Sequence, residues 1–304
     1  MLRVRLLECL AADQARLRQV ASADLAAAVP SCPDWTVADL VRHVAVVYLH
    51  KVECMRTGRI PSAWPPDLSG EEPLALLDRA GAALRAEFDS RDSAALAPTW
   101  YDPDQTVGFW LRRMAQETVV HRVDAELATA QPVAEIPTDL AVDGIDEVLR
   151  IFLAYGSRRW PEDFTDVLPE PEVTVLATTG PAGWLVRLGP DGATVTTDRA
   201  AVRAGVAVAE RSAPPDPAPG PATPSGRLLA APPTSGGPGD NASSGGGGSP
   251  DDGLAGAGAA ATISASPERL LLWLWRRSAD DAVRWAGDRA AVERLRLTLA
   301  PATR

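Results

Sequence analysis

Long hydrophobic runs are absent from the 304-residue sequence. No apolar segment approaches the roughly 20 residues that a membrane-spanning helix needs. Near the N-terminus the leucines are interrupted by charged residues such as Arg3, Arg5 and Glu8, so this stretch lacks the continuous apolar segment of a secretory signal. We therefore expect a cytoplasmic protein with no membrane partner.

Cysteine is scarce, and basic residues are fewer than acidic ones. Cys9, Cys32 and Cys54 are odd in number and share no close spacing, so neither a disulfide framework nor a thiolate zinc site is suggested. Forty acidic residues against thirty basic ones give a formal net charge of −10, and no basic cluster stands out. This balance argues against nucleic acid or an anionic membrane as a partner. Small molecules or proteins are the expected partners, and the oligomeric state is left open.

The first half of the chain has the pattern of successive amphipathic helices, with apolar residues recurring at intervals of three and four. Thr36 followed by Asp39 has the pattern of a capping box, which marks the start of a helix. These patterns predict a helical domain over residues 1–160. The expected helices cover residues 2–28, 36–56, 71–90, 106–130 and 138–160.

The pattern changes after residue 160. EVTVLATT, GWLVRLG and ATVTT are rich in β-branched residues and flank short turns, as antiparallel strands do. Ser266 and Pro267 suit the N-cap and first turn of a helix, and another helix is expected over residues 288–299. These patterns predict a small α+β domain over residues 161–304.

One segment of this second domain has the composition of a disordered insertion. Residues 212–261 contain ten prolines and twelve glycines in fifty positions and no aromatic residue. Such a segment cannot bury enough apolar surface to offset the entropic cost of ordering. We therefore expect the chain of the second domain to be interrupted there.

Three polar residues form a candidate metal site. Glu117 and His121 are four residues apart in an expected helix, so their side chains project from one face. His43, from the second expected helix, completes a three-ligand set if the two helices are neighbours. Two imidazoles and a carboxylate suit zinc or another divalent first-row metal and leave positions open for water or substrate. The alternative is a set of ordinary solvated or core residues, because spacing alone is a weak signal.

Two other polar residues, Asp124 and His50, lie in the same expected helices. Asp124 stays on the same helix face and is expected to orient His121 or an arginine from outside the ligand set. His50 has no partner at helical spacing except Glu53, so we interpret it as an ordinary surface or core histidine.

Two segments carry a family resemblance. SCPDWTVADLVRHV resembles the pattern CPxWTVxDLxxH, and FWLRRMAQETVVHRVDAEL resembles WxRRxxxExxxHRxDA, both from the mycothiol-dependent maleylpyruvate isomerase family. The resemblance implies a DinB-like up-down four-helix bundle in which His43, Glu117 and His121 bind a divalent metal, normally zinc. Many relatives carry histidine where this chain has Gln116. A helix neighbour points about 100° away, so the ligand set is expected to survive.

The resemblance continues in the second half. GWLVRLGPDGATVTT and ERLLLWLWRRSADDAVRWAGDRAAVERL resemble the small α/β C-terminal domain of the same family, which is similar to sterol-carrier modules. Arg277 matches an arginine common there and is a candidate catalytic residue that binds a substrate carboxylate. The alternative, which we favour from the residues alone, is a solvated charge that suits the C-terminal end of an apolar helix.

The resemblance implies a metal-dependent enzyme that uses mycothiol as its thiol cofactor, with isomerase or thiol S-transferase chemistry on a small, anionic substrate. A different class of function also fits the sequence: a non-catalytic protein that binds a small ligand or a partner and keeps the metal for structure, with the insertion as a tether. The substrate is not determined by the sequence, because a fold does not specify one.

Overall fold

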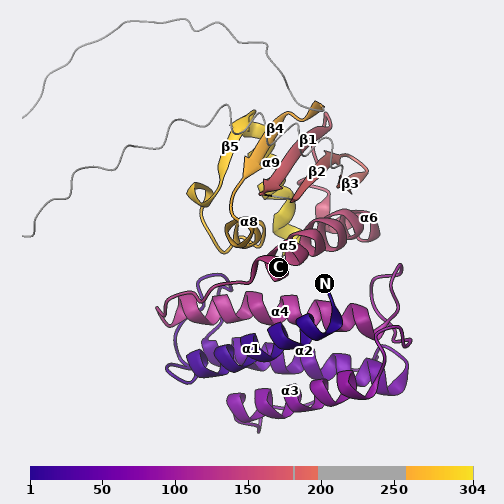
Figure 1. Cartoon of the computed structure of the whole chain (residues 1–304), viewed down its shortest axis with the longest axis vertical. Coiled ribbons are helices and arrows are strands. Elements are labelled where there is room, and N and C mark those ends of the chain that lie inside the picture. The colour runs from indigo at the N-terminus through magenta and orange to yellow at the C-terminus, as the bar shows by residue number, and fades with distance from the viewer. Residues whose placement is uncertain (181, 198–257, 304) are drawn as a thin grey trace, which may run out of the picture.

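Two halves make up the part of the chain that the computed structural model describes, which comprises residues 1–180, 182–197 and 258–303. Figure 1 shows the long helices of the N-terminal half lying side by side, with a sheet and its covering helices stacked on them. A helical N-terminal region and an α/β C-terminal region are thus both confirmed. Residues 212–257 of the predicted insertion lie outside the described residues, and Ala261, its last predicted residue, is instead the first residue of a strand.

The four long helices follow the predicted segments closely. They are α1 (Arg3–Ala21), α2 (Val37–Thr57), α3 (Pro73–Ser90) and α4 (Val107–Ala128). α1 packs along α4, while α2 packs along both α3 and α4. On α2 the buried residues Val37, Leu40, Val41, Val44 and Tyr48 recur at three and four positions, and each fully buried aliphatic side chain contributes about 1.5 to 3 kcal/mol.

The first helix is shorter than predicted, because the residues after it have another role. The expected helix to residue 28 is wrong beyond Ala21. The carbonyls of Leu25 and Ala27 accept hydrogen bonds from the N–H groups of Ala38 and Val37. These donors lie in the first turn of α2, where no partner within the helix exists. The chain therefore leaves α1 early to satisfy the start of α2.

The helices α2 and α4 begin in the same way. Thr36 caps α2 by accepting a hydrogen bond from the N–H of Asp39, whose carboxylate in turn accepts from the N–H of Thr36, which confirms the predicted capping box. Thr106 caps α4 by accepting from the N–H of Phe109. Each cap lies in a short antiparallel bridge to an earlier loop residue. The starting points of both helices, and hence the positions of their side chains, are set by these contacts.

A five-stranded mixed sheet forms the C-terminal half. Its strands are β1 (Val173–Thr179), β2 (Ala182–Gly189), β3 (Gly192–Thr196), β4 (Ala261–Ser264) and β5 (Arg284–Gly287), in the order β3-β2-β1-β4-β5. β1 and β4 are parallel and the other neighbours are antiparallel. β5 is not among the predicted strands, because its four residues are mostly exposed and carry no alternating pattern.

Two helices, α8 and α9, complete the C-terminal half. α8 (Pro267–Leu274) starts after Ser266 as predicted, although the Ser266 hydroxyl makes no capping hydrogen bond. α9 (Arg289–Ala302) starts from Asp288, whose carboxylate accepts from the N–H of Ala290. α9 contacts β1 and β4, so its apolar face closes the core of this half.

A helical segment connects the two halves. It consists of α5 (Thr138–Glu147), the π-helical η1 (Val148–Tyr155) and the short α6 (Gly156–Arg159), followed by the 3-10 turn η2 (Pro161–Phe164). α5 packs against α8, and η1 packs against β3 and α9. On the other side, Arg112 of α4 forms an ion pair with Asp143 of α5. The segment contacts both halves, and the boundary at residue 160 stays a prediction.

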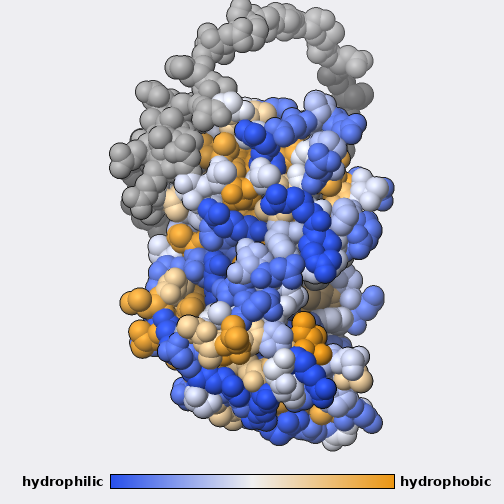
Figure 2. Space-filling model, turned by 90° about the vertical axis from the view of Figure 1, so that its right-hand side faces the viewer, coloured by the Kyte–Doolittle hydropathy of each residue, from blue (hydrophilic) through white to orange (hydrophobic). Residues whose placement is uncertain are grey.

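The surface is mixed in character. On the face seen in Figure 2, hydrophilic residues predominate and hydrophobic ones form separate small groups. The large exposed hydrophobic residues of the described part include Leu2 and Val4 at the start of α1, Ile60 after α2 and Leu96 before α4. Among the described residues, no helix combines the length and apolar composition of a membrane span.

The capping box of α2 provides a test of the fold near the site. Thr36→Ala removes the hydroxyl that accepts from Asp39 N–H, and we expect it to lower the free energy of unfolding by about 1 kcal/mol. Thr36→Ser keeps a capping hydroxyl and is expected to retain most of that stability. Urea denaturation of the full chain measures both. Equal destabilisation by alanine and serine would contradict the capping role.

Candidate metal centre

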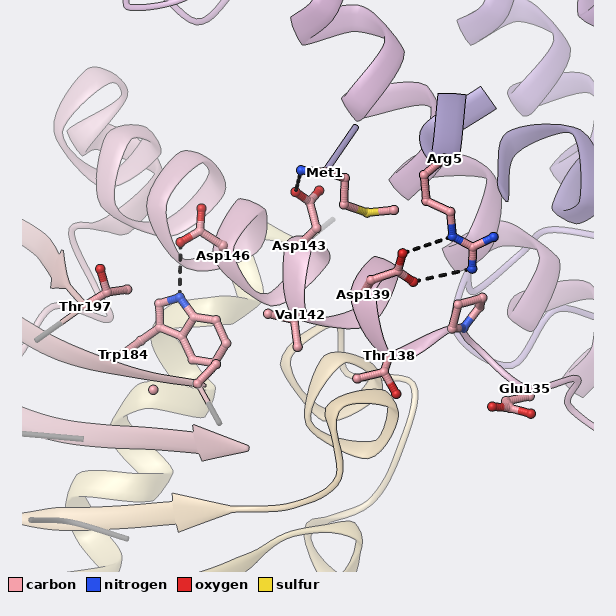
Figure 3. A pocket seen from close by; sticks show the side chains of 13 residues that line it. Met1, Arg5, Glu135, Thr138, Asp139, Val142, Asp143, Asp146, Trp184 and Thr197 are labelled. Atoms are coloured by element: carbon pink, nitrogen blue, oxygen red, sulfur yellow. Dashed lines mark hydrogen bonds and ion pairs between the residues drawn. The ribbon is translucent and has the colours of Figure 1, made fainter. Parts of the chain in front are cut away.

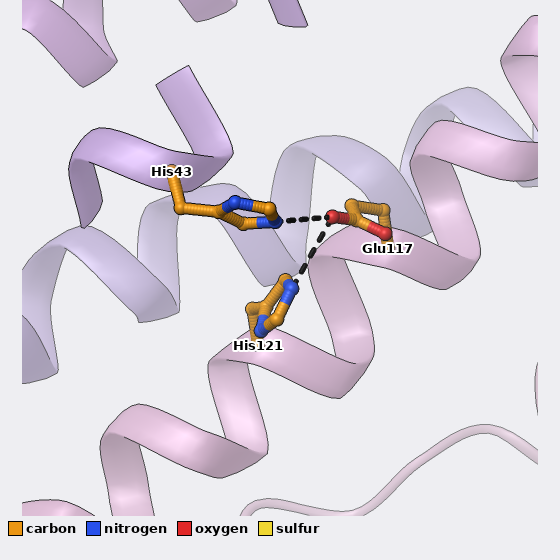
Figure 4. A group of neighbouring side chains, drawn as sticks. All are labelled: His43, Glu117 and His121. Carbon is orange, nitrogen blue, oxygen red and sulfur yellow. Dashed lines mark hydrogen bonds and ion pairs between the residues drawn. The ribbon is translucent and has the colours of Figure 1, made fainter. Parts of the chain in front are cut away.

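The three predicted ligands meet at one point between α2 and α4. Figure 4 shows His43 of α2 facing Glu117 and His121 of α4, with both imidazoles directed at the same carboxylate oxygen. Nε2 of His43 and Nε2 of His121 each lie 3.2 Å from Oε1 of Glu117. The helices are antiparallel, because Lys51, further along α2 than His43, lies over the ring of Trp110, which comes before Glu117 on α4.

The spacing of these atoms fits a single divalent ion. One donor atom from each of the three residues lies within 4.8 Å of the others. Around a tetrahedral zinc with bonds of about 2.0 Å, neighbouring donors are about 3.3 Å apart. The two distances to Glu117 are close to that value. Two neutral imidazole nitrogens and one carboxylate also have the donor chemistry of an open, three-ligand zinc site.

Asp124 orients His121 from the next turn of α4. Its Oδ2 accepts a hydrogen bond from Nδ1 of His121 at 2.9 Å, which leaves Nε2 directed at Glu117. The carboxylate is fully buried, and it also accepts a hydrogen bond from the hydroxyl of Ser31 in the loop before α2. A carboxylate on the distal nitrogen is the usual support of a metal-binding histidine.

The buried charges of α4 shift one another's pKa values. Burial alone would lower the pKa of His121, but Glu117 and Asp124 outweigh it and raise the pKa to about 9. Burial likewise opposes ionisation of Glu117, yet His121, His43 and Arg113 hold the pKa of this carboxyl well below its ordinary value. Without a metal, the site thus holds a carboxylate beside a charged imidazole over the neutral pH range.

Arg113 holds the second oxygen of Glu117. Its Nη2 donates to Oε2 of Glu117 at 2.8 Å, one helical turn away, and its Nη1 donates to Glu147 of α5. Burial raises the pKa of Glu147 to about 7, although Arg113 and Arg112 oppose that shift. Arg113 belongs to the motif FWLRRMAQETVVHRVDAEL, but the motif alone predicts no role for it. Its partner Glu147 lies outside that motif, so no local pattern indicated the pair.

The candidate ligands line a cavity of 740 Å³. Its walls come from the loop before α2, from α2 and α4, from η1 and from the segment after α8. Trp35, Phe152 and Trp275 supply aromatic surface, and the Trp35 ring lies 4.9 Å from the His43 ring between centroids. Tryptophans at patterned positions in helices are expected to be packing residues. Trp110 and Trp273 are indeed buried, whereas Trp35 and Trp275 also face the cavity.

Arg277 reaches the site from the C-terminal half. Its Nε and Nη2 donate to the two oxygens of Asp124, each at 2.9 Å, and its side chain is only 7% exposed. The favoured expectation of a solvated charge is therefore wrong, because tertiary packing brings the end of α8 against α4. Since Arg277 also lines the cavity, it lies at the site, but its fork is occupied by Asp124. A direct role with substrate stays a prediction.

Three further residues lie away from the ligand set: Gln116 and Arg122 of the second motif, and His50. Gln116 is buried and donates to Leu140 O and to Asp143, so it faces α5. Arg122 pairs with Asp13 of α1 and so joins α1 to α4. His50 lies beside Lys51 and the ring of Trp64 and does not join the other two histidines.

A larger cavity, of 1110 Å³, lies elsewhere between the two halves. Figure 3 shows its acidic side chains engaged with partners: Asp139 with Arg5, and Asp146 with the indole N–H of Trp184. Its described lining includes neither histidine nor cysteine. The cluster of His43, Glu117 and His121 therefore lines the smaller cavity.

Comparison with known proteins agrees with the motifs. Residues 6–126 match the family model of the mycothiol maleylpyruvate isomerase N-terminal domain. The match covers most of the helical half of the chain. No curated protein and no solved structure matches the chain. The matched residues include all three candidate ligands and Asp124, whereas Arg277 lies beyond them.

The raised pKa of His121 predicts how stability depends on pH in chelator-treated protein. The folded pKa of about 9 exceeds the ordinary 6.5, so the stabilising contribution is complete below about pH 6.5 and is lost as pH rises towards 9. Burial lowers the pKa of Lys51 to about 8, and this titration acts in the opposite direction above that pH. We therefore expect the free energy of unfolding to fall between about pH 6.5 and 8.

Urea denaturation at a series of pH values measures this fall. His121→Gln should abolish the part of the fall above about pH 7.5, because the buried carboxyl of Glu147, with a pKa of about 7, adds a fall of the same sign only below that pH. His50→Ala is the matched control, because burial and Lys51 lower the pKa of His50 to about 4 and it stays neutral throughout the window. A fall above about pH 7.5 that persists in His121→Gln would contradict the assignment.

The contact between Arg277 and Asp124 predicts a large loss of stability in Arg277→Ala. Removing one partner leaves a buried carboxylate with fewer donors, and we expect a loss of about 3 kcal/mol. Arg289→Ala, which breaks an exposed ion pair with Glu293, should cost about 0.5 kcal/mol or less. Denaturation of the full chain compares the two variants, and a similar small effect for both would refute a tight contact at Asp124.

Proposed function

We propose that the protein is a metal-dependent, mycothiol-using enzyme with isomerase or thiol S-transferase chemistry on a small anionic substrate. The observation that carries the proposal is the convergence of His43, Glu117 and His121 at a cavity, within a segment that matches the mycothiol maleylpyruvate isomerase N-terminal domain. In this proposal the three side chains hold the metal, with zinc as the ion that best suits the donor set.

A bound zinc would favour thiolate over thiol and would polarise a carbonyl oxygen. The chain's own residues supply the setting. Asp124 keeps Nε2 of His121 directed at the site, and Arg113 occupies the second oxygen of Glu117 so that the first remains available. Both contacts are made by buried groups, so the donors are held in place before any ligand arrives.

The cavity walls suit a small molecule that carries both apolar and charged groups. Aromatic rings of Trp35, Phe152 and Trp275 exclude water from one part, and arginines line another. Excluding water strengthens the electrostatic interactions within the site. The nucleophile in this proposal is the thiol of mycothiol. None of the chain's three cysteines is required for it, although Cys32 lines the cavity.

The finer fold assignments belong to the same proposal. We assign α1 to α4 to a DinB-like up-down four-helix bundle, an assignment that the antiparallel contact of α2 with α4 supports. We assign the sheet with α8 and α9 to the sterol-carrier-like C-terminal domain of the family. A cytoplasmic location and the boundary at residue 160 are proposed on the same sequence grounds.

The proposal predicts stoichiometric metal in the purified full chain. Elemental analysis should find about one divalent ion per chain in the wild type and a clear loss in His43→Ala and His121→Ala, because each variant removes one of three donors. His50→Ala is the matched control, since it removes the remaining histidine, and it should keep the metal. Equal metal content in all four proteins would contradict the site.

The alternative function is a structural metal in a protein that binds a ligand without catalysis. Calorimetric titration of metal-loaded and chelator-treated protein with mycothiol separates the two functions. The proposed enzyme should bind mycothiol only when metal is present. If chelation lowers the melting temperature while mycothiol fails to bind either form, the structural alternative holds and the enzyme proposal falls.

A further inference from the structure

The turn after α8 has an unusual residue at its tightest point. The N–H of Arg277 donates to Leu272 O at 2.7 Å, and the N–H of Arg276 donates to Trp273 O at 3.0 Å. These two bonds define a Schellman motif. Its left-handed position normally belongs to glycine, because a Cβ atom is strained there. Here Arg276 occupies it, with φ of 63°.

The side chain of Arg276 does not offset that strain with a hydrogen bond or an ion pair to another described residue. Arg276 is exposed, and among the described residues no acidic group forms an ion pair with it. A strained backbone position retained without structural benefit is a reason to look for a functional role. Arg276 lines the same 740 Å³ cavity as His43, Glu117 and His121.

The other two arginines that line the cavity have acidic partners. Arg113 pairs with Glu117 and with Glu147, and Arg277 pairs with Asp124 through Nε and Nη2 while its Nη1 donates to Trp275 O. Arg276 is thus the lining arginine that has no acidic partner in the described part of the chain. A small anion that enters the cavity meets a guanidinium whose donors are not already taken by a carboxylate.

We infer that Arg276 is the residue that binds the anionic group of the cavity's ligand, and that this group is a carboxylate. The planar guanidinium holds a carboxylate with two parallel hydrogen bonds. The Schellman turn places Arg277 against Asp124 and Arg276 at the cavity in consecutive positions. The inference rests on the proposed function only in that the cavity takes a small anionic substrate; it does not require that a metal be bound.

The strain provides a test in which stability and binding change in opposite directions. Arg276→Gly removes the side chain and relieves the left-handed position, so we expect the melting temperature to rise by about 2 to 4 °C. The same variant should weaken the binding of succinate, used as a simple dicarboxylate probe, by about tenfold. Arg276→Lys keeps the charge and the strain, so its melting temperature should match the wild type and its affinity should fall less.

Ala130→Gly is the matched control. Ala130 follows α4 with φ of 52° and is not among the residues that line the cavity. This variant should raise the melting temperature and leave succinate binding unchanged. Calorimetric titration of the full chain, both chelator-treated and zinc-loaded, measures the affinities.

Each outcome decides the inference. A stabilised Arg276→Gly variant with weakened succinate binding supports it. Unchanged binding in that variant, a lowered melting temperature, or no succinate binding by the wild type overturns it. Because the chelator-treated protein is titrated separately, a failure to bind zinc would overturn the proposed function and still leave the role of Arg276 measurable.

Discussion

The buried carboxylate of Asp124 is the interaction on which the rest of the site depends. It accepts from His121 on its own helix, from Ser31 in the loop before α2 and from Arg277 after α8. An isolated carboxylate in this environment would be costly, and these three donors offset that cost. The requirement to satisfy one charge therefore joins the helical half to the α/β half and sets the orientation of an imidazole at the same time.

Arg113 repeats this arrangement about three turns earlier on α4. It bonds the second oxygen of Glu117 and is itself held by Glu147 of α5. Each candidate ligand on α4 is thus positioned by a buried opposite charge that is anchored in another part of the chain. Such double support limits the motion of the donor atoms, which is a requirement for geometry that suits a metal. It also explains how the segment after residue 126 contributes to a site whose ligands all lie before it.

Much of the local structure is readable from the residues, because its causes are local. Capping at Thr36, the three-and-four spacing on α2 and α4, and the β-branched segments after residue 170 all predict the elements found. The two errors in the predicted elements have physical causes of their own. α1 ends early because the following residues satisfy the start of α2, and β5 is too short to have a pattern. Tertiary demands override propensity at both places.

The sequence by itself determined the donor types, the single helix face shared by Glu117 and His121, and the motifs that match a family. Only the tertiary structure decided that His43 meets them, that Asp124 is bonded to Arg277 and that Arg276 is left at the cavity without an acidic partner. The reason is that helical spacing fixes directions within one helix, whereas contacts between residues 153 positions apart, as in the Asp124–Arg277 pair, depend on how separate elements pack.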